Sequence, residues 1–407
     1  MFLASAGVAH ADDLAAMPGM TMMSGALGHY SMMRDGSGTS WQPQSTPMQG
    51  APFAFGGWTG MAHGYVDLVY DHQGGPRGQA KTFSESMLML MAQHAAGPGT
   101  LTFHTMLSLD PAMGADGYPL LLQTGETADG VHPLIDRQHP HDLFMELSAT
   151  FSVPVGQGTS VFLYAGYPGE PALGPVTFMH RVSGIDDPAA PISHHWLDST
   201  HITYGVLTWG VVHGDWKLEG SAFNGREPDQ HRWTFDPPRL DSWSGRLSWN
   251  PAQDWALQVS YGDLKRPEQL EPTVSQHRIT ASATYNRFLG DANWQTTLAW
   301  GRNYDEPGRV LDGVLLESAY SFGRSTLFGR LEEVQKDDLF EVPSSLAGRV
   351  FRVGEASLGY VYNLPVARHL ALGLGAMGTV DIVPAAIRPA YGSAPVSWMP
   401  FVRLALR

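Results

Sequence analysis

The sequence predicts an all-β protein, a transmembrane antiparallel β-barrel of about sixteen strands with an N-terminal Met-rich extension. Three observations support this fold class. Segments of about 10 to 14 residues alternate apolar and polar side chains along most of the chain. Gly and Pro number 46 and 29, as expected for many strands joined by turns. No run of about 18 to 20 apolar residues offers a membrane-spanning helix.

The N-terminus divides into two segments before the barrel. Residues 1–11 resemble the end of a secretory signal peptide, with Ala9-His10-Ala11 as the cleavage site, and we expect the sequence to begin inside that peptide. Residues 12–55 are rich in Met, Gly and Pro and have no hydrophobic period, which predicts a tail or a plug of the lumen. Residues 56–407 form the predicted barrel.

Dyad alternation defines the strands in order along the chain. In the clearest segment, Trp255, Leu257, Val259 and Tyr261 alternate with small and polar residues. The longest connections, 110–140 and 168–199, are expected to be extracellular loops. A soluble β-sandwich or propeller is the alternative fold. The predicted strands are 57–71, 82–95, 100–109, 141–154, 159–167, 200–213, 215–224, 240–249, 254–264, 276–288, 292–302, 312–322, 325–334, 350–363, 368–380 and 394–406.

Charge and composition narrow the function classes. The formal net charge is −14, from 39 acidic and 25 basic residues, which argues against nucleic acid as a partner and permits attraction of cations. The chain has no Cys, so soft-metal chemistry must use its 18 Met and 17 His.

The first three predicted strands place Met and His side chains on one face. If Leu88 and Leu90 of the predicted strand 82–95 face lipid, the opposite face of this strand points into the lumen. Neighbouring strands lie about 4.8 Å apart, so their inward residues lie side by side. Thioether and imidazole ligands suit Cu(I). The alternatives are that the Met side chains only fill space, or that the register is shifted by one residue. The inward residues are Met61, His63, Met87, Met89, Met91, His104 and Met106.

Two histidine-rich segments precede predicted strands. His139 and His141 lead into a strand with Glu146 inward and Met145 outward, and the other segment holds His194, His195 and His201. We expect these histidines near the outer mouth, where imidazole and carboxylate ligands can bind Zn(II) or Cu(II). In the alternative interpretation, the same residues are polar contacts that hold folded-in loops in place.

The tail carries a third group of soft ligands. Met17, Met20, Met22 and Met23 have the spacing with which a flexible chain can surround a soft ion. The alternative is an unstructured linker.

Two further functions compete with metal binding. Inward Arg246, Arg278, Arg330 and Arg403, with several inward Glu, fit a water-filled general diffusion porin. The segment Ser193–His201 holds the residue types of a hydrolase at the barrel rim, but there is no G-x-S-x-G motif and no spacing that favours a triad. We therefore expect a protein that is not an enzyme.

Six strings of residues stand out along the chain: Gly36–Pro43, Gly117–Thr127, Asp136–Asp142, Glu170–Pro175, His194–His201 and Phe223–Asp229. They resemble a family of bacterial outer-membrane proteins, found mainly in proteobacteria, that has no assigned activity. The resemblance spans nearly the whole chain from about residue 17. Its Met/His-rich character is similar to that of copper-resistance proteins, but the dense Met-Asp-His head of those proteins is absent, so no ligand residue is carried over.

Together these observations predict an outer-membrane β-barrel that binds or conducts copper. The tail captures the ion, the inner wall offers weak sequential sites, and the outer histidines line the mouth. Copper is not required for the fold. The expected partners are outer-membrane lipid, a metal ion and a periplasmic metallochaperone or efflux protein.

Overall fold

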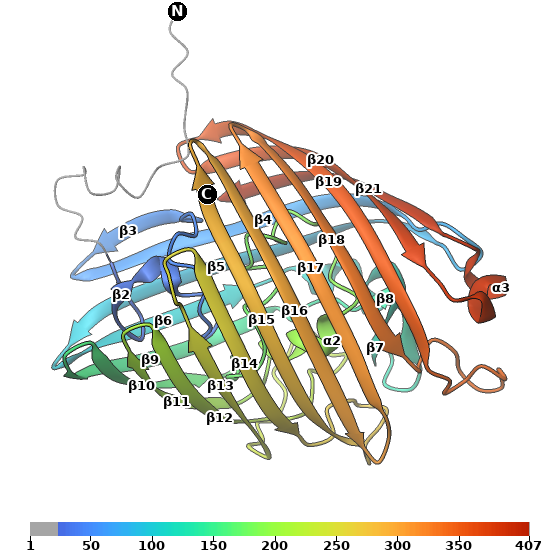
Figure 1. Cartoon of the computed structure of the whole chain (residues 1–407), viewed down its shortest axis with the longest axis horizontal. Helices are drawn as coiled ribbons and strands as arrows, with labels where there is room; N and C mark the ends of the chain where they lie inside the picture. The colour runs from blue at the N-terminus through green and yellow to red at the C-terminus, as the bar shows by residue number, and fades with distance from the viewer. Residues whose placement is uncertain (1–22, 407) are drawn as a thin grey trace, which may run out of the picture.

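The wall of the molecule is a closed antiparallel sheet. In a computed structural model, which describes residues 23–406, sixteen strands pair around the ring (Figure 1). Each predicted range overlaps one wall strand, so the predicted fold class is confirmed. The wall strands are β4 (Trp58–His72), β5 (Ala80–Ala96), β6 (Gly99–Leu107), β9 (Phe144–Gly156), β10 (Thr159–Gly166), β11 (Val206–His213), β12 (Trp216–Phe223), β13 (Ser242–Trp249), β14 (Trp255–Leu264), β15 (Ser275–Leu289), β16 (Ala292–Glu306), β17 (Val310–Phe322), β18 (Ser325–Lys336), β19 (Phe351–Ala367), β20 (Leu370–Ile382) and β21 (Val396–Leu406).

Shorter elements accompany the wall. They are β1 (Ser24–Gly25), β2 (Gly28–Ser31), β3 (Ala51–Phe55), β7 (Tyr118–Thr127), β8 (Pro133–Gln138), α2 (His194–Leu197), α3 (Arg388–Tyr391) and 3₁₀ turns at Met32–Arg34, Asp110–Met113, Ser199–His201 and Ala385–Ile387. None of the described helices is long and apolar enough to span a membrane.

Alternation along each strand decides which side chains face the lumen. On β5, Leu88 and Leu90 are each 44% exposed on the outside, whereas Met87 and Met89 are 1% and 7% exposed. Exposed Leu, Val, Trp and Tyr continue this outer surface on the other wall strands, as a bilayer requires. The alternative of a soluble sandwich or propeller is therefore wrong, because the sheet closes on itself and its outer face is apolar.

The barrel closes between its first and last wall strands. Arg403 on β21 is paired in register with Asp67 on β4, and Arg403 Nε donates to Asp67 Oδ1 at 2.8 Å. β4 begins before the paired part of β21, and its remaining edge pairs with β3. Residues 51–55, predicted as tail, therefore form a strand, because that edge would otherwise leave backbone groups unpaired.

Two predicted connections contain more structure than expected. The loop 110–140 includes the hairpin β7–β8, in which the Tyr118 ring stacks on Phe83 of the wall at a centroid distance of 4.3 Å. The strand predicted at 200–213 begins only at Val206, because α2 and the turn at Ser199–His201 occupy the residues before it. Period-2 alternation does not distinguish such short helical turns from a strand end.

The expected outward position of Met145 is wrong. Met106 pairs with Glu146 and Leu107 pairs with Phe144, so one extra residue interrupts the β6–β9 register. This β-bulge turns the Met145 side chain inward, where it is fully buried with Met87, Met106 and other apolar residues.

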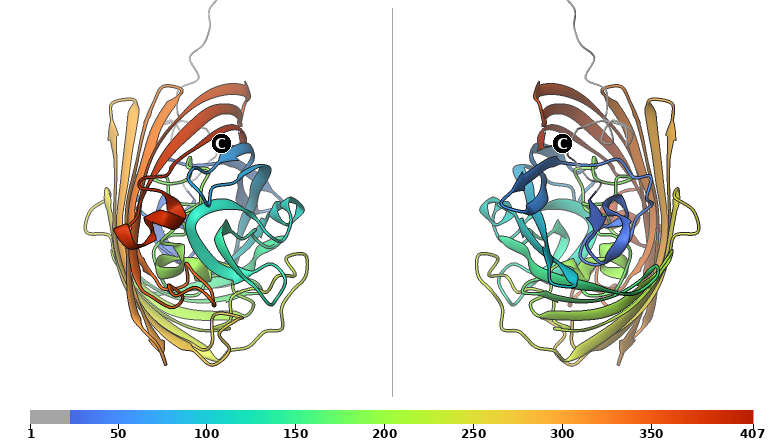
Figure 2. Two further views of the ribbon diagram at one scale, coloured as in Figure 1. Left: turned by 90° about the vertical axis from the view of Figure 1, so that its right-hand side faces the viewer. Right: turned by 90° about the vertical axis from the view of Figure 1, so that its left-hand side faces the viewer.

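The lumen is filled by two segments of the chain. Views from both ends show the inward segments inside the ring of strands (Figure 2). Residues 167–205 between β10 and β11 are almost entirely buried, and residues 23–50 contact the inner wall nearer the other end. We call residues 167–205 the inward loop and residues 23–50 the N-terminal segment.

Candidate functional site

The inner faces of β4, β5 and β6 carry the predicted Met and His residues as lateral neighbours. Strand pairing aligns them in two rows across the three strands, and each member is buried or half-buried. The structure therefore brings these residues together on the lumenal side, as the face alternation predicts. The rows are Met61, Met91 and His104, and His63, Met89 and Met106, with Met87 beside Tyr65.

Two imidazoles contact thioethers directly. His63 Nε2 lies 3.2 Å from Met89 Sδ, and His180 Nε2 lies 3.3 Å from Met106 Sδ. The His63 and His180 rings meet edge to face at a centroid distance of 5.5 Å. His180 comes from the inward loop, so the loop completes this group. The sequence analysis does not select His180, because its partners lie far away in the chain.

A cavity lies against the same side chains. It has a volume of about 80 Å³ and is lined by Met61, His63, Met89, Met91, His104 and His180, together with residues of the N-terminal segment. Both ring nitrogens of His104 are buried without a hydrogen-bond partner among the described residues. His104 Nδ1 is 3.6 Å from Glu146 Oε1. We call this group the Met/His pocket.

The five predicted mouth histidines also come together, although they come from two loops. The centroids of the imidazole rings lie 5.1 Å apart for His194 and His201, 5.4 Å apart for His141 and His201, and 6.2 Å apart for His139 and His195. Burial lowers the pKa of His194 to about 4, and it holds the pKa values of His139 and His201 well below the usual value. These three imidazoles are therefore neutral at pH 7.

Carboxylates and a carbonyl fix the orientation of three of these rings. His141 Nδ1 lies 2.8 Å from Asp110 Oδ2, and His194 Nδ1 lies 2.8 Å from Asp198 Oδ1. His201 Nδ1 lies 2.8 Å from the Asp198 carbonyl oxygen. This leaves Nε2 of His141 and of His201 buried without a partner among the described residues, an arrangement common for histidines that bind metals.

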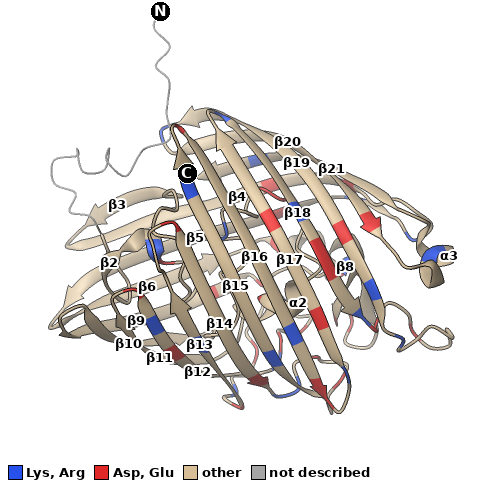
Figure 3. Ribbon diagram, viewed as in Figure 1, with Lys and Arg blue, Asp and Glu red and all other residues tan. Residues whose placement is uncertain are grey.

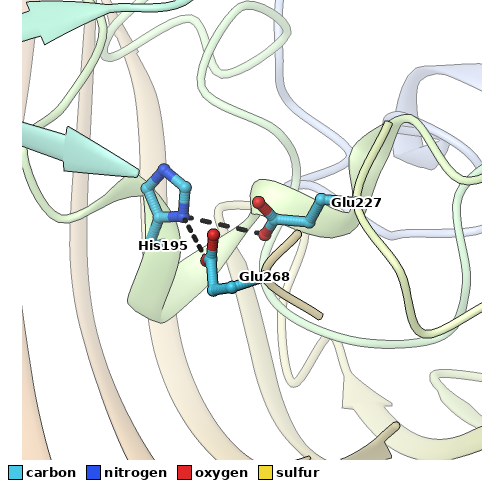
Figure 4. Close-up of side chains that lie close together, drawn as sticks. All are labelled: His195, Glu227 and Glu268. Carbon is cyan, nitrogen blue, oxygen red and sulfur yellow. Dashed lines mark ion pairs between the residues drawn. The ribbon is translucent and has the colours of Figure 1, made fainter. Parts of the chain in front are cut away.

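A carboxylate pair joins the cluster at His195. Glu227 and Glu268 come from the loops after β12 and β14, and each has a carboxylate oxygen 3.7 Å from His195 Nδ1 (Figure 4). One ligand atom from each of the three residues lies within 4.8 Å of the others. Sequence analysis missed both glutamates, because no spacing relates them to His195 in the chain.

Inward charges of the wall hold the inward loop. Arg181 of the loop donates to Glu317 on β17 at 2.6 Å and to Asp198 at 2.8 Å. Arg330 lies 3.4 Å from Asp187, and Arg403 donates to the Ile185 carbonyl oxygen at 2.5 Å. Charged residues of both signs lie along the wall strands in Figure 3. The charges predicted to line a channel are therefore paired with the loop.

The N-terminal segment is held in the same way at the other end of the lumen. Arg34 contacts Asp215 at 2.9 Å, and Lys217 donates to the Thr39 carbonyl oxygen. Arg246 Nη2 donates to Thr39 Oγ1 at 3.0 Å. Of the four predicted tail ligands, Met23 is half-buried beside this segment, and Met17, Met20 and Met22 lie outside the described residues.

The residues considered for a rim hydrolase make other contacts. The Ser193 hydroxyl donates to Glu332 Oε1 at 2.5 Å, and the Ser199 hydroxyl accepts from Arg278 at 3.0 Å. His194 is bonded to Asp198, which also holds Arg181. These side chains connect the loop to itself and to the wall.

Comparison with known proteins identifies the fold. No protein-family model matches the chain, and no curated protein matches it. Among solved structures it is similar to Salmonella typhi OmpF in complex with daunomycin, with a TM-score of 0.51, 10% identity, and 87% of this chain and 100% of that chain covered. It is also similar to an anion-selective porin from Comamonas acidovorans, with a TM-score of 0.50, 11% identity, and 86% and 99% covered.

The fold and the apolar outer surface both indicate that the protein lies in a membrane. At this level of identity, the similarity establishes a porin-like barrel fold. A closed sixteen-strand barrel with an apolar outer face is built for a lipid bilayer, and barrels of this kind span the bacterial outer membrane. The chain is therefore a bacterial outer-membrane β-barrel.

Proposed function

We propose that this protein is a diffusion channel of the porin type whose lumen is narrowed by the inward loop and the N-terminal segment. One observation carries the proposal: the inner wall presents charges of both signs, and these charges hold the loop through ion pairs such as Arg181 with Glu317 and Arg330 with Asp187. The same loop also packs apolar side chains, among them Ile192, Trp196 and Leu197, against the wall, so a change in its position must displace buried ion pairs and apolar contacts together.

The proposal predicts that solute flux depends on how firmly the inward loop is held. Glu317 receives Arg181 and also lies 3.5 Å from Arg330, so it joins the loop to two wall strands. Replacing Glu317 by Gln removes the negative charge and keeps the size of the side chain. We expect Glu317→Gln to loosen the loop and to raise the flux of small sugars.

Liposome swelling tests this expectation. Full-length wild-type protein should admit a small sugar slowly, and Glu317→Gln should admit it at least about twofold faster. Glu333→Gln is the matched control, because Glu333 is exposed on β18 and pairs with Arg352 outside the lumen. The channel proposal fails if neither the wild type nor Glu317→Gln admits any sugar while both are folded in the liposomes.

A second function is favoured by the contacts in the Met/His pocket. We propose that this pocket binds Cu(I), because thioether and neutral imidazole groups are its preferred ligands and two His–Met pairs already lie within 3.3 Å. Copper would then be a cargo that enters the lumen. A periplasmic metallochaperone or efflux protein would be the partner that supplies or removes it.

Titration with Cu(I) under reducing conditions, against a competing chelator, separates this function from a plain porin. Met89→Leu should weaken binding by about tenfold or more, since it removes a thioether that contacts His63. Met377→Leu is the matched control, because Met377 is also buried and faces Met399 on the next strand. If the wild type does not bind Cu(I), the pocket serves only as packing.

A further inference from the structure

We propose that His195, Glu227 and Glu268 form a site for a divalent cation of the Zn(II) class, separate from the Met/His pocket. The three residues come from α2, from the loop between β12 and β13 and from the loop between β14 and β15. A bound cation would join the inward loop to two loops of the barrel. This inference does not depend on copper binding or on solute passage.

The spacing of the ligand atoms fits such an ion. In a tetrahedral Zn(II) site with bonds of about 2.0 Å, neighbouring ligand atoms lie about 3.3 Å apart. His195 Nδ1 lies 3.7 Å from a carboxylate oxygen of Glu227 and 3.7 Å from one of Glu268. Figure 4 shows both carboxylates directed at the same side of the imidazole ring. Small side-chain movements would bring all three atoms within bonding distance of one ion.

The burial of Glu227 is a second and independent observation. Its side chain is 4% exposed, and neither of its carboxylate oxygens has a partner at ordinary hydrogen-bond distance among the described residues, although the Ser199 hydroxyl acts on it from farther away. A buried carboxylate without hydrogen bonds is unfavourable, and a second carboxylate beside it increases the cost. A divalent cation between the two carboxylates would supply the missing partner.

The cationic side chains around the site do not occupy the space between the two carboxylates. Arg278 and Lys336 both act on the site electrostatically. However, Arg278 donates to Ser199, Gln276 and Asn303, and Lys336 donates to Gln123 and Thr124. The ion-pair contact that Glu227 and Glu268 share is therefore with His195.

The ligand types select the metal class. One imidazole nitrogen and two carboxylate oxygens suit Zn(II) and similar divalent ions, whereas Cu(I) prefers the thioethers of the Met/His pocket. The His195–Glu227–Glu268 site and the Met/His pocket therefore bind different ions in this proposal. The Zn(II) titration can be made without the Cu(I) titration.

The test is a titration of the folded full-length protein with Zn(II) against a competing chelator. We expect one equivalent in the wild type and a loss of affinity of about 100-fold or more in Glu227→Gln and His195→Gln. Two control variants should still bind one equivalent of Zn(II). They are His231→Gln, at an exposed histidine in the same loop as Glu227, and His63→Gln in the Met/His pocket.

X-ray absorption on Zn-loaded wild type provides a readout that does not rely on variants. The proposal expects a shell of one imidazole and oxygen ligands without sulfur. A shell of several imidazoles would overturn it in favour of the neighbouring histidines. The absence of Zn(II) binding, or an equivalent retained by Glu227→Gln, would mean that the three residues form an ion pair only. Neither result would affect the swelling or Cu(I) measurements.

Discussion

At the scale of single residues, Gly125 determines where His195 can lie. Gly125 has a φ of +114°, and a Cβ at this position would lie 2.5 Å from both Cε1 and Nε2 of His195. Any other residue would therefore clash with the imidazole as well as strain the backbone. The absence of a side chain at Gly125 thus leaves room for the His195 ring in the position from which it faces Glu227 and Glu268.

Gly125→Ala should consequently displace His195 and weaken Zn(II) binding by about tenfold or more. Gly158→Ala is the control, because Gly158 also has a positive φ, +65°, but nothing lies within 4 Å of its Cβ position. Both variants are measured in the chelator competition. An unchanged Zn(II) affinity in Gly125→Ala would show that the ring position does not matter for binding.

At the scale of elements, the wall strands are predictable from alternation, whereas the inward loop is anticipated only by the alternative interpretation of folded-in loops held by polar contacts. Alternation alone assigns Met87, Met89 and Met91 to the inner face, because each side of a wall strand has a uniform environment. The bulge that turns Met145 inward depends on pairing with β6, which no local pattern records. His180 and Glu227 reach their positions through the paths of long loops, so their partners lie far away in sequence.

The docking of α2 on the wall is another element-scale feature. Gly301 on β16 and Gly313 on β17 are paired in register, and both lie against Trp196 of α2. A Cβ at Gly313 would be 2.8 Å from the Trp196 ring, so the two glycines make the recess that receives this side chain. The inward loop therefore needs glycine on the wall to reach its place.

We expect Gly313→Val to push α2 away from the wall and to increase sugar flux in liposome swelling. Gly378→Val serves as the comparison, since Gly378 is also in a wall strand and nothing lies within 4 Å of its Cβ position. Equal flux in the two variants would indicate that α2 does not narrow the lumen.

At the scale of the whole molecule, the barrel separates an apolar outer surface from a filled interior in which charged and apolar side chains are both buried. Outward Leu, Val and Trp side chains face lipid, while Arg246, Arg330 and Arg403 are each at most 2% exposed inside. Arg246 pairs with Glu219 of the neighbouring wall strand, and Arg330 and Arg403 pair with Asp187 and Asp186 of the inward loop; these charges would be costly to bury alone. The interior thus combines buried ion pairs with apolar clusters such as the one around Trp196 and Leu197.

Single-channel recording in planar bilayers tests the channel proposal most directly. The full-length wild type should show small, discrete openings, and Glu317→Gln should show a larger conductance than Glu333→Gln, because Glu317 contacts the inward loop and Glu333 does not. Bilayers that contain folded wild type and folded Glu317→Gln but carry no current would contradict the proposal that solutes pass through this barrel.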